Sequence, residues 1–326
     1  MEPVTHVLTG ALLARTGFNR RAAYATAAMA IAAELPDIDT LWSLTGPIPG
    51  FEHHRGITHT FVGVPFEAAL LTAAFCFVHR RRSKPTKAPV NWPFLYFATL
   101  IALLSHLFLD WTNNYGLRPF FPFNPRWYSG SFVFIFEPIL FVLLLIGLLA
   151  PKFLGTVQTW AIAALLAICA LWGFRFHEHS RALQIAATTT PAPLFASPSP
   201  IDPFTWHVVA DTPAYDQLST VNTRTGTSAP GLRINKAAPT VATLVAKRSP
   251  LAEPYLDWSA LPLVDQGAVT PDGLTPVTFR DARFLGSIPP LDARHRAPLS
   301  GTVFVDLAAD DAHRIARMEL DGRVQR

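Results

Sequence analysis

Histidine and aspartate side chains recur in four short stretches of the first 110 residues. Neutral imidazole and carboxylate groups are ligands for zinc and similar divalent cations. His106 and Asp110 are four residues apart, which puts both on one face of a helix. The sequence therefore predicts a metal site whose candidate ligands are His6, Asp37, Asp39, His54, His59, His106 and Asp110.

Seven candidate ligands exceed the three or four that one zinc ion needs. We therefore expect one or two divalent ions, with Zn²⁺ as the expected metal. Such sites suit phosphoester and related hydrolysis, in which one metal lowers the pKa of bound water to about 7 and a second polarises the substrate oxygen. Glu137 is a candidate general base or a partner to a ligating histidine. Arg55 is a candidate for orienting an anionic substrate group.

Each of these residues also has a structural interpretation. Asp37 and Asp39 could end and cap a helix, and Arg55 could form a salt bridge to either of them. Glu67 lies in an apolar stretch, where it could be part of a proton path or a protonated acid bonded to a neighbouring helix. The joint pattern favours a metal site, because ionisable residues in membrane segments are costly and tend to be functional.

The composition points to a membrane protein. Of the 326 residues, 50% are hydrophobic and 15% are charged, against about 25% charged in typical soluble domains; the mean hydropathy is +0.26. Four stretches have the roughly 20 apolar residues that a span needs: 57–78, 93–112, 131–150 and 157–175. Two shorter ones, 4–15 and 21–35, predict a helical hairpin. No cleavable signal peptide is expected.

The distribution of Lys and Arg predicts an orientation. The loop 79–87 holds five cations and no acid, so it is expected in the cytoplasm. The candidate ligands and the C-terminal region then lie on the outer side. We expect a transmembrane metal-site domain (1–180), a Pro-rich linker (181–204) and a small β-rich extracytoplasmic domain (205–326). Its expected strands are 205–209, 240–245, 275–285 and 301–307.

These features predict a mainly α fold: a polytopic transmembrane helical bundle in the inner (cytoplasmic) membrane with a β-rich tail. Several other classes receive no support. The net charge of +4 is small, so no nucleic-acid partner is expected. Two cysteines form no disulfide framework and no CxxC zinc ribbon. No GxSxG, P-loop or strand-adjoining GxGxxG motif is present.

The motifs resemble those of the membrane-bound metal-dependent hydrolase family, the YdjM-like inner-membrane proteins. The matching residues are Thr5-His6 with Gly10, the PDID block 36–39, the HRGITH block 54–59, and HLFLD (106–110) with Gly116 and Pro122-Phe123. They cover residues 1–175. Thr60 stands where Ser is usual and keeps the hydroxyl group. The resemblance implies a hydrolase with a divalent metal and a distant similarity to zinc-dependent phospholipase C folds.

We therefore expect a membrane-embedded metal-dependent hydrolase that attacks an ester or phosphoester, with a lipid as one candidate substrate. One alternative is a non-catalytic membrane protein whose metal is structural and which recruits a protein partner; some relatives are described as LexA-binding. Another is an ion-coupled transporter that uses Glu67 and the His/Asp set. An enzyme needs an open metal position, whereas a structural site is closed by protein ligands.

Overall fold

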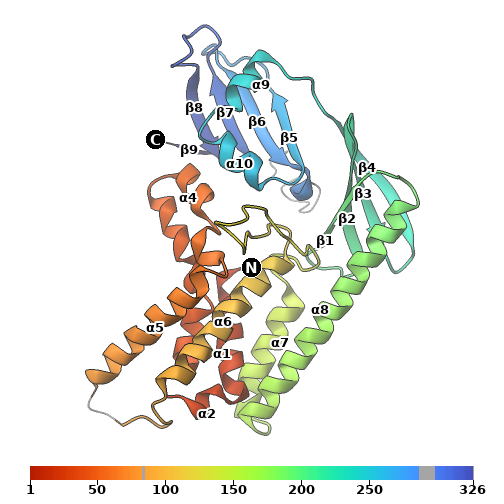
Figure 1. Ribbon diagram of the computed structural model, residues 1–326. Helices are drawn as coiled ribbons and strands as arrows, with labels where there is room; N and C mark the ends of the chain where they lie inside the picture. The colour runs from red at the N-terminus through yellow and green to blue at the C-terminus, as the bar shows by residue number, and fades with distance from the viewer. Residues whose placement is uncertain (83–84, 286–297, 326) are drawn as a thin grey trace. The chain divides into compact units, whose positions relative to one another are not determined.

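The computed structural model describes residues 1–82, 85–285 and 298–325 of the chain, which divides into two compact units (Figure 1). The first unit comprises Met1–Asp39 and Arg55–His177, and the second comprises Thr40–His54 and Glu178–Arg326. The first is helical and the second contains two β-sheets. The prediction of a helical N-terminal half followed by a β-rich C-terminal part is thus confirmed.

The first unit is built mainly from helices. They are α1 (Pro3–Leu13), α2 (Asn19–Arg21), α3 (Ala25–Ala32), α5 (Gly63–Arg80), α6 (Trp92–Thr112), α7 (Pro138–Leu149) and α8 (Val157–Ala187), which continues past the end of the unit. A π-helical segment, Ala14–Phe18, follows α1. The described residues also form 3₁₀ segments at Ile57–His59, at Ala150–Lys152 and at Leu35–Leu44, of which the last continues into the second unit.

Two helices in the described ranges, α6 and α8, are long and apolar enough to cross a membrane. A third span exists if Pro47–His59 and Gly63–Arg80 form one bent span. On α8, side chains such as Ile162 and Leu166 are exposed, as expected of a surface that contacts lipid tails.

The stretch 131–150, predicted as a membrane span, is helical over only part of its length. Its helix, α7, begins only at Pro138 and has 12 residues, about 18 Å of helix against a hydrocarbon core of about 30 Å. The preceding residues are held elsewhere, because the N–H groups of Phe132 and Val133 both donate to the carbonyl of Thr112, at 3.0 and 3.1 Å. These bonds fold the segment against the end of α6.

The predicted hairpin forms from α1 and α3, and a glycine sets how closely they approach. A Cβ atom on Gly10 would lie 2.2 Å from the carbonyl oxygen of Met29 and 2.7 Å from Cβ of Ala33. Only glycine leaves room for this contact. The close approach brings the turn after α3, which carries Asp37, beside the start of α1, which carries His6.

The second unit holds two antiparallel sheets. The first sheet contains β1 (Leu194–Pro198), β2 (Thr205–Asp211), β3 (Tyr215–Asn222) and β4 (Thr227–Asn235), and the second contains β5 (Pro262–Gln266), β6 (Thr275–Asp281), β7 (Gly301–Val305), β8 (Ile315–Leu320) and β9 (Arg323–Val324), each in sequential order. The described part of this unit also contains helices α4 (Pro47–His53), α9 (Val241–Ala246) and α10 (Ala252–Trp258) and the 3₁₀ segment Ala282–Phe284.

Two local expectations differ from the structure. The stretch 240–245, predicted as a strand, is the helix α9, because Thr240 and Thr243 form a reciprocal capping box that starts a helix. The segment 181–204, predicted as a linker, is partly regular: α8 runs to Ala187, and β1 pairs with β2 through Leu194–Pro198.

Candidate metal centre

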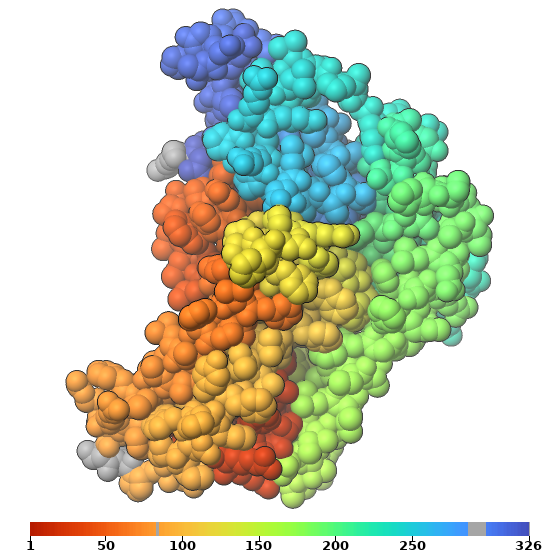
Figure 2. Space-filling view, viewed as in Figure 1, coloured from red at the N-terminus to blue at the C-terminus, as the bar shows by residue number. Residues whose placement is uncertain are grey.

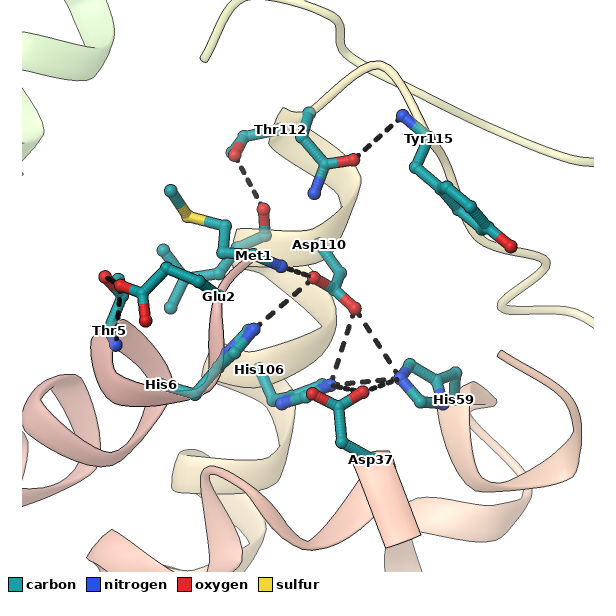
Figure 3. A network of polar contacts seen from close by, with 12 residues as sticks. Met1, Glu2, Thr5, His6, Asp37, His59, His106, Asp110, Thr112 and Tyr115 are labelled. Atoms are coloured by element: carbon teal, nitrogen blue, oxygen red, sulfur yellow. Dashed lines mark hydrogen bonds and ion pairs between the residues drawn. The ribbon is translucent and has the colours of Figure 1, made fainter. Parts of the chain in front are cut away.

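Four side chains converge inside the first unit from three separate elements (Figure 3). Asp37 lies in the 3₁₀ segment after α3, His59 ends the 3₁₀ segment before α5, and His106 and Asp110 lie on α6. His59, His106 and Asp110 are fully buried and Asp37 is half-buried. One ligand atom from each lies within 4.8 Å of the other three, so the group could hold a metal ion.

The separations between these atoms match those of a tetrahedral site. Nε2 of His59 lies 3.1 Å from Nε2 of His106 and 3.2 Å from Oδ1 of Asp37. Nε2 of His106 lies 3.7 Å from the same Asp37 oxygen. Oδ2 of Asp110 lies 3.5 Å from both histidine nitrogens. Ligand atoms about 2.0–2.1 Å from a zinc ion are about 3.4 Å apart in a tetrahedron.

The donor set also has the chemistry of a cation site. Oδ2 of Asp110 is buried without a hydrogen-bond partner among the described residues. Such an orphaned acceptor is costly in a protein interior. Two imidazole nitrogens and two carboxylate oxygens that point at one another are best satisfied by a shared cation.

The far nitrogens of both imidazoles are held by the surrounding chain. Nδ1 of His106 lies 2.7 Å from the carbonyl oxygen of Ala33, to which it donates, so Nε2 is left with its lone pair directed into the cluster. Nδ1 of His59 lies 3.1 Å from Oδ2 of Asp39. Both rings therefore have the orientation that metal-ligating histidines show.

Asp39 lies behind His59. Its Oδ2 also accepts the backbone N–H of Arg55 at 2.8 Å and the hydroxyl of Thr58 at 3.1 Å. The predicted Asp37–Asp39 pair is thus divided between two positions, because residues two apart on a 3₁₀ helix point in different directions. Burial disfavours charge on Asp37, but contact with His59 lowers the pKa of its carboxyl to about 2, so Asp37 is ionised as a ligand must be.

A known protein family matches the first half of the chain. Residues 1–182, more than half of the chain, match the family described as YdjM inner membrane protein. The chain belongs to the YdjM family. It is also 27% identical over 150 residues to the "Uncharacterized protein YfhP" of Bacillus subtilis (strain 168), an alignment covering 44% of this chain and 43% of that protein. The alignment thus spans less than half of that relative. No solved structure matches the chain.

In this YdjM-family chain, Arg55 is engaged by the protein itself. Its Nη2 lies 2.8 Å from Oδ1 of Asp110, and its Nη1 donates to the carbonyl oxygen of Gly116 at 2.6 Å. The guanidinium also lies over the ring of Tyr115, 4.6 Å from the centroid. The salt bridge is to Asp110 rather than to the Asp37 or Asp39 considered from sequence. These contacts orient Asp110; the predicted contact with substrate stays a prediction.

His6 lies beside the four-residue cluster. Its ring stacks on His106 with centroids 3.9 Å apart, and its Nε2 lies 3.4 Å from Oδ1 of Asp110. Both ring nitrogens are buried without a hydrogen-bond partner in the described ranges. The same Asp110 oxygen accepts a hydrogen bond from the amino group of Met1. Asp110 therefore turns Oδ2 to the cluster, and its Oδ1 faces His6, Met1 and Arg55.

Two further predicted residues are not members of the four-residue cluster. His54 follows α4 and falls in the second unit, so its role as a ligand stays a prediction. Glu137 precedes α7, and its Oε2 accepts from Nε of Arg175 at 3.1 Å and from Nη2 of the same side chain. Both partners are buried. Its role as a general base also stays a prediction.

The family motifs did not draw attention to Glu34, which precedes Asp37 by three residues. Its Oε2 is buried without a hydrogen-bond partner among the described residues. Burial, reinforced by the charge of Asp37, raises the pKa of this carboxyl to about 7. Tyr115 and Thr58 were missed as well, because their roles arise only from contacts with Arg55 and Asp39.

Proposed function

We propose that this YdjM-family protein is a membrane-embedded metal-dependent hydrolase that cleaves an ester or phosphoester. The observation that carries the proposal is the convergence of Asp37, His59, His106 and Asp110 within 4.8 Å. A divalent ion held by these residues, with Zn²⁺ the best match to the donor set, would supply Lewis acidity and lower the pKa of bound water. Arg55 would keep Asp110 ionised and oriented.

A lipid or lipid-like substrate is supported by the surroundings of the cluster. His106 and Asp110 lie six and two residues before the last residue of α6, a candidate membrane span. The loop that follows α6 is rich in aromatic residues, and Phe120 and Phe123 on it are exposed. Figure 2 shows this segment, in yellow, on the surface of one face. Such side chains suit contact with lipid at the membrane interface.

We propose Glu34 as a second candidate for the proton acceptor, beside Glu137. Its buried oxygen has no partner among the described residues, and the residue sits in the turn that leads to Asp37. Glu137, in contrast, is already engaged by Arg175. A carboxylate with a spare oxygen near the cluster is the better placed group to take a proton from water.

One observation favours a structural metal instead. Four protein ligands can complete a tetrahedral zinc site, whereas catalytic sites keep a position for water. The coordination of the bound ion distinguishes a structural metal from a catalytic one. X-ray absorption of the zinc-loaded protein would show an oxygen ligand that exchanges with solvent in a catalytic site, and only protein ligands in a structural one.

The activity itself is tested with purified, metal-loaded protein and a panel of phosphoester, carboxylic ester and phospholipid substrates. We expect turnover that is lost in His59→Ala and Asp110→Ala. Glu34→Gln should lower the rate by about 10²–10⁴ while the metal content is retained. His79→Ala, at the far end of α5, is the matched control and should leave turnover unchanged. The proposal fails if the panel shows no turnover, or if the cluster variants retain it.

We further propose a multi-pass topology with the C-terminal unit outside the cytoplasm. The support is the distribution of cations, because the connections Ala14–Tyr24, 81–91 and Ala150–Thr156 contain Arg and Lys but no Asp or Glu, as cytoplasmic connections do. Alkaline phosphatase fused after residue 326 is expected to be active, and green fluorescent protein fused there dark. The reverse pattern would overturn this topology.

A further inference from the structure

The end of the first unit that lies away from the metal cluster is strongly basic. His59 precedes the first residue of α5, and Arg80 is its last residue, about 27 Å further along the helix. In Figure 1, α2, the end of α5 and the turn before α8 lie together at this end. Its cations among the described residues are Arg15, Arg20, Arg21, Arg80, Arg81, Arg82, Lys87 and Lys152.

A cavity of about 350 Å³ opens at this end. Two of its lining side chains are the guanidinium groups of Arg20 and Arg21, and three are the aromatic rings of Phe18, Phe94 and Phe97. Gln158 of α8 closes another side. One part of the cavity wall is therefore positively charged, and another part is aromatic.

The local backbone creates this space. Gly17 has φ of +134° and interrupts the helical path between α1 and α2, a conformation that glycine adopts most readily. The carbonyl of Thr16 accepts a hydrogen bond from the side-chain amide of Gln158 at 2.8 Å. The cavity wall is thus fixed by contacts between segments far apart in the sequence, and it does not depend on the loop 80–87.

The two arginines are exposed, and within the described ranges neither forms a salt bridge. Arg21 lies over Phe94, 6.0 Å from the ring centroid. Phe18 lies 5.7 Å from Phe94 and 6.4 Å from Phe97, centroid to centroid. Phe97 belongs to the candidate span α6 and is 48% exposed. The aromatic wall therefore continues onto a surface that the lipid tails would contact.

We propose that this cavity binds the headgroup of an anionic membrane lipid. Guanidinium groups grip a phosphate through paired, forked hydrogen bonds, and basic pockets between membrane helices accept anionic headgroups. Arg20 and Arg21 hold the phosphate, and Phe94 and Phe97 contact the first part of an acyl chain. A free phosphate shares the first interaction but not the second, so the aromatic wall favours the lipid. The proposal does not depend on the hydrolase activity.

The test measures lipid binding by the full-length protein in detergent, using native mass spectrometry. We expect phosphatidylglycerol to bind more tightly than phosphatidylcholine, and Arg20→Gln/Arg21→Gln to weaken the phosphatidylglycerol complex by about tenfold or more. The matched control is Arg80→Gln/Arg81→Gln, which removes the same charge from the same end without touching the cavity. It should change binding less than about twofold.

Two other outcomes would overturn the proposal. Equal loss in both double variants would mean that only the general positive field attracts the lipid. Displacement of phosphatidylglycerol by millimolar inorganic phosphate, with Phe97→Ala without effect, would mean that the cavity recognises phosphate alone. All variants should keep the metal content and unfolding temperature of the wild-type protein, which separates this test from the metal site and from misfolding.

Discussion

Replacement of His106 by alanine is expected to abolish metal binding by the purified protein. Its Nε2 lies within 3.7 Å of ligand atoms from His59, Asp37 and Asp110, so the ring supplies one corner of the tetrahedron. Loss of an outer partner of a ligand lowers metal affinity by about 10–100-fold, and loss of the ligand itself should cost more. Elemental analysis by mass spectrometry should show zinc in the wild-type protein and none in the variant.

Thermal unfolding gives a second measurement of the same prediction. A metal that binds only the folded state stabilises it by about 4 kcal/mol when present at 1,000 times its dissociation constant. A chelator should therefore lower the unfolding temperature of the wild-type protein and leave that of His106→Ala unchanged. Metal retained at full stoichiometry in His106→Ala would disprove the proposed cluster.

The metal content of the variant His6→Ala shows how many ions each chain binds. If the four-residue cluster is the whole site, this variant should keep one ion per chain, since His6 is not one of its four ligands; His6 contacts Oδ1 of Asp110 and stacks on His106. If the protein binds two ions and His6 is a ligand of the second, His6→Ala should lose one of two. His79→Ala serves as the control for removal of an imidazole, because His79 is bonded to Tyr24 instead, at 2.9 Å.

Much of the site could be predicted from sequence because its members are marked by local spacing. The four-residue step from His106 to Asp110 fixes their shared face once the segment is a helix. The apolar composition of 93–112 made that helix evident. The separation of Asp37 from Asp39 was not predictable, because it depends on the 3₁₀ geometry of their turn. The contact of Arg55 with Asp110 was equally hidden, since Arg55 takes a left-handed backbone conformation, with φ of +55°.

The wrong predictions about the fold also arose from contacts that the sequence does not reveal. One is between residues far apart in the chain, and the other caps a helix. Residues 131–137 belong to the apolar stretch 131–150 that predicted a span, yet two of their N–H groups donate to the carbonyl of Thr112. The segment 240–245 is rich in β-prone residues, yet the hydroxyls of Thr240 and Thr243 start a helix. In both places a few hydrogen bonds outweigh the propensity of the whole segment.

The buried ion pair of Glu137 and Arg175 leads to a second large expected effect. Glu137 is 2% exposed and Arg175 is fully buried. Removing one partner of such a pair leaves an uncompensated charge in the interior, which costs about 3–5 kcal/mol. Arg175→Met should therefore destabilise the protein by this amount in equilibrium unfolding measured in detergent. Arg181→Met, an exposed arginine on the same helix, should change stability by no more than about 0.5 kcal/mol.

The double variant Glu137→Leu/Arg175→Met separates a structural role of Glu137 from a role in proton transfer. Replacing both charges by apolar side chains should restore most of the lost stability, because apolar packing is often as favourable as a buried ion pair. If Glu137 serves only to hold Arg175, the double variant should also keep its turnover and metal. A stable, metal-loaded double variant that has lost turnover would assign the proton acceptor to Glu137 and remove Glu34 from that role.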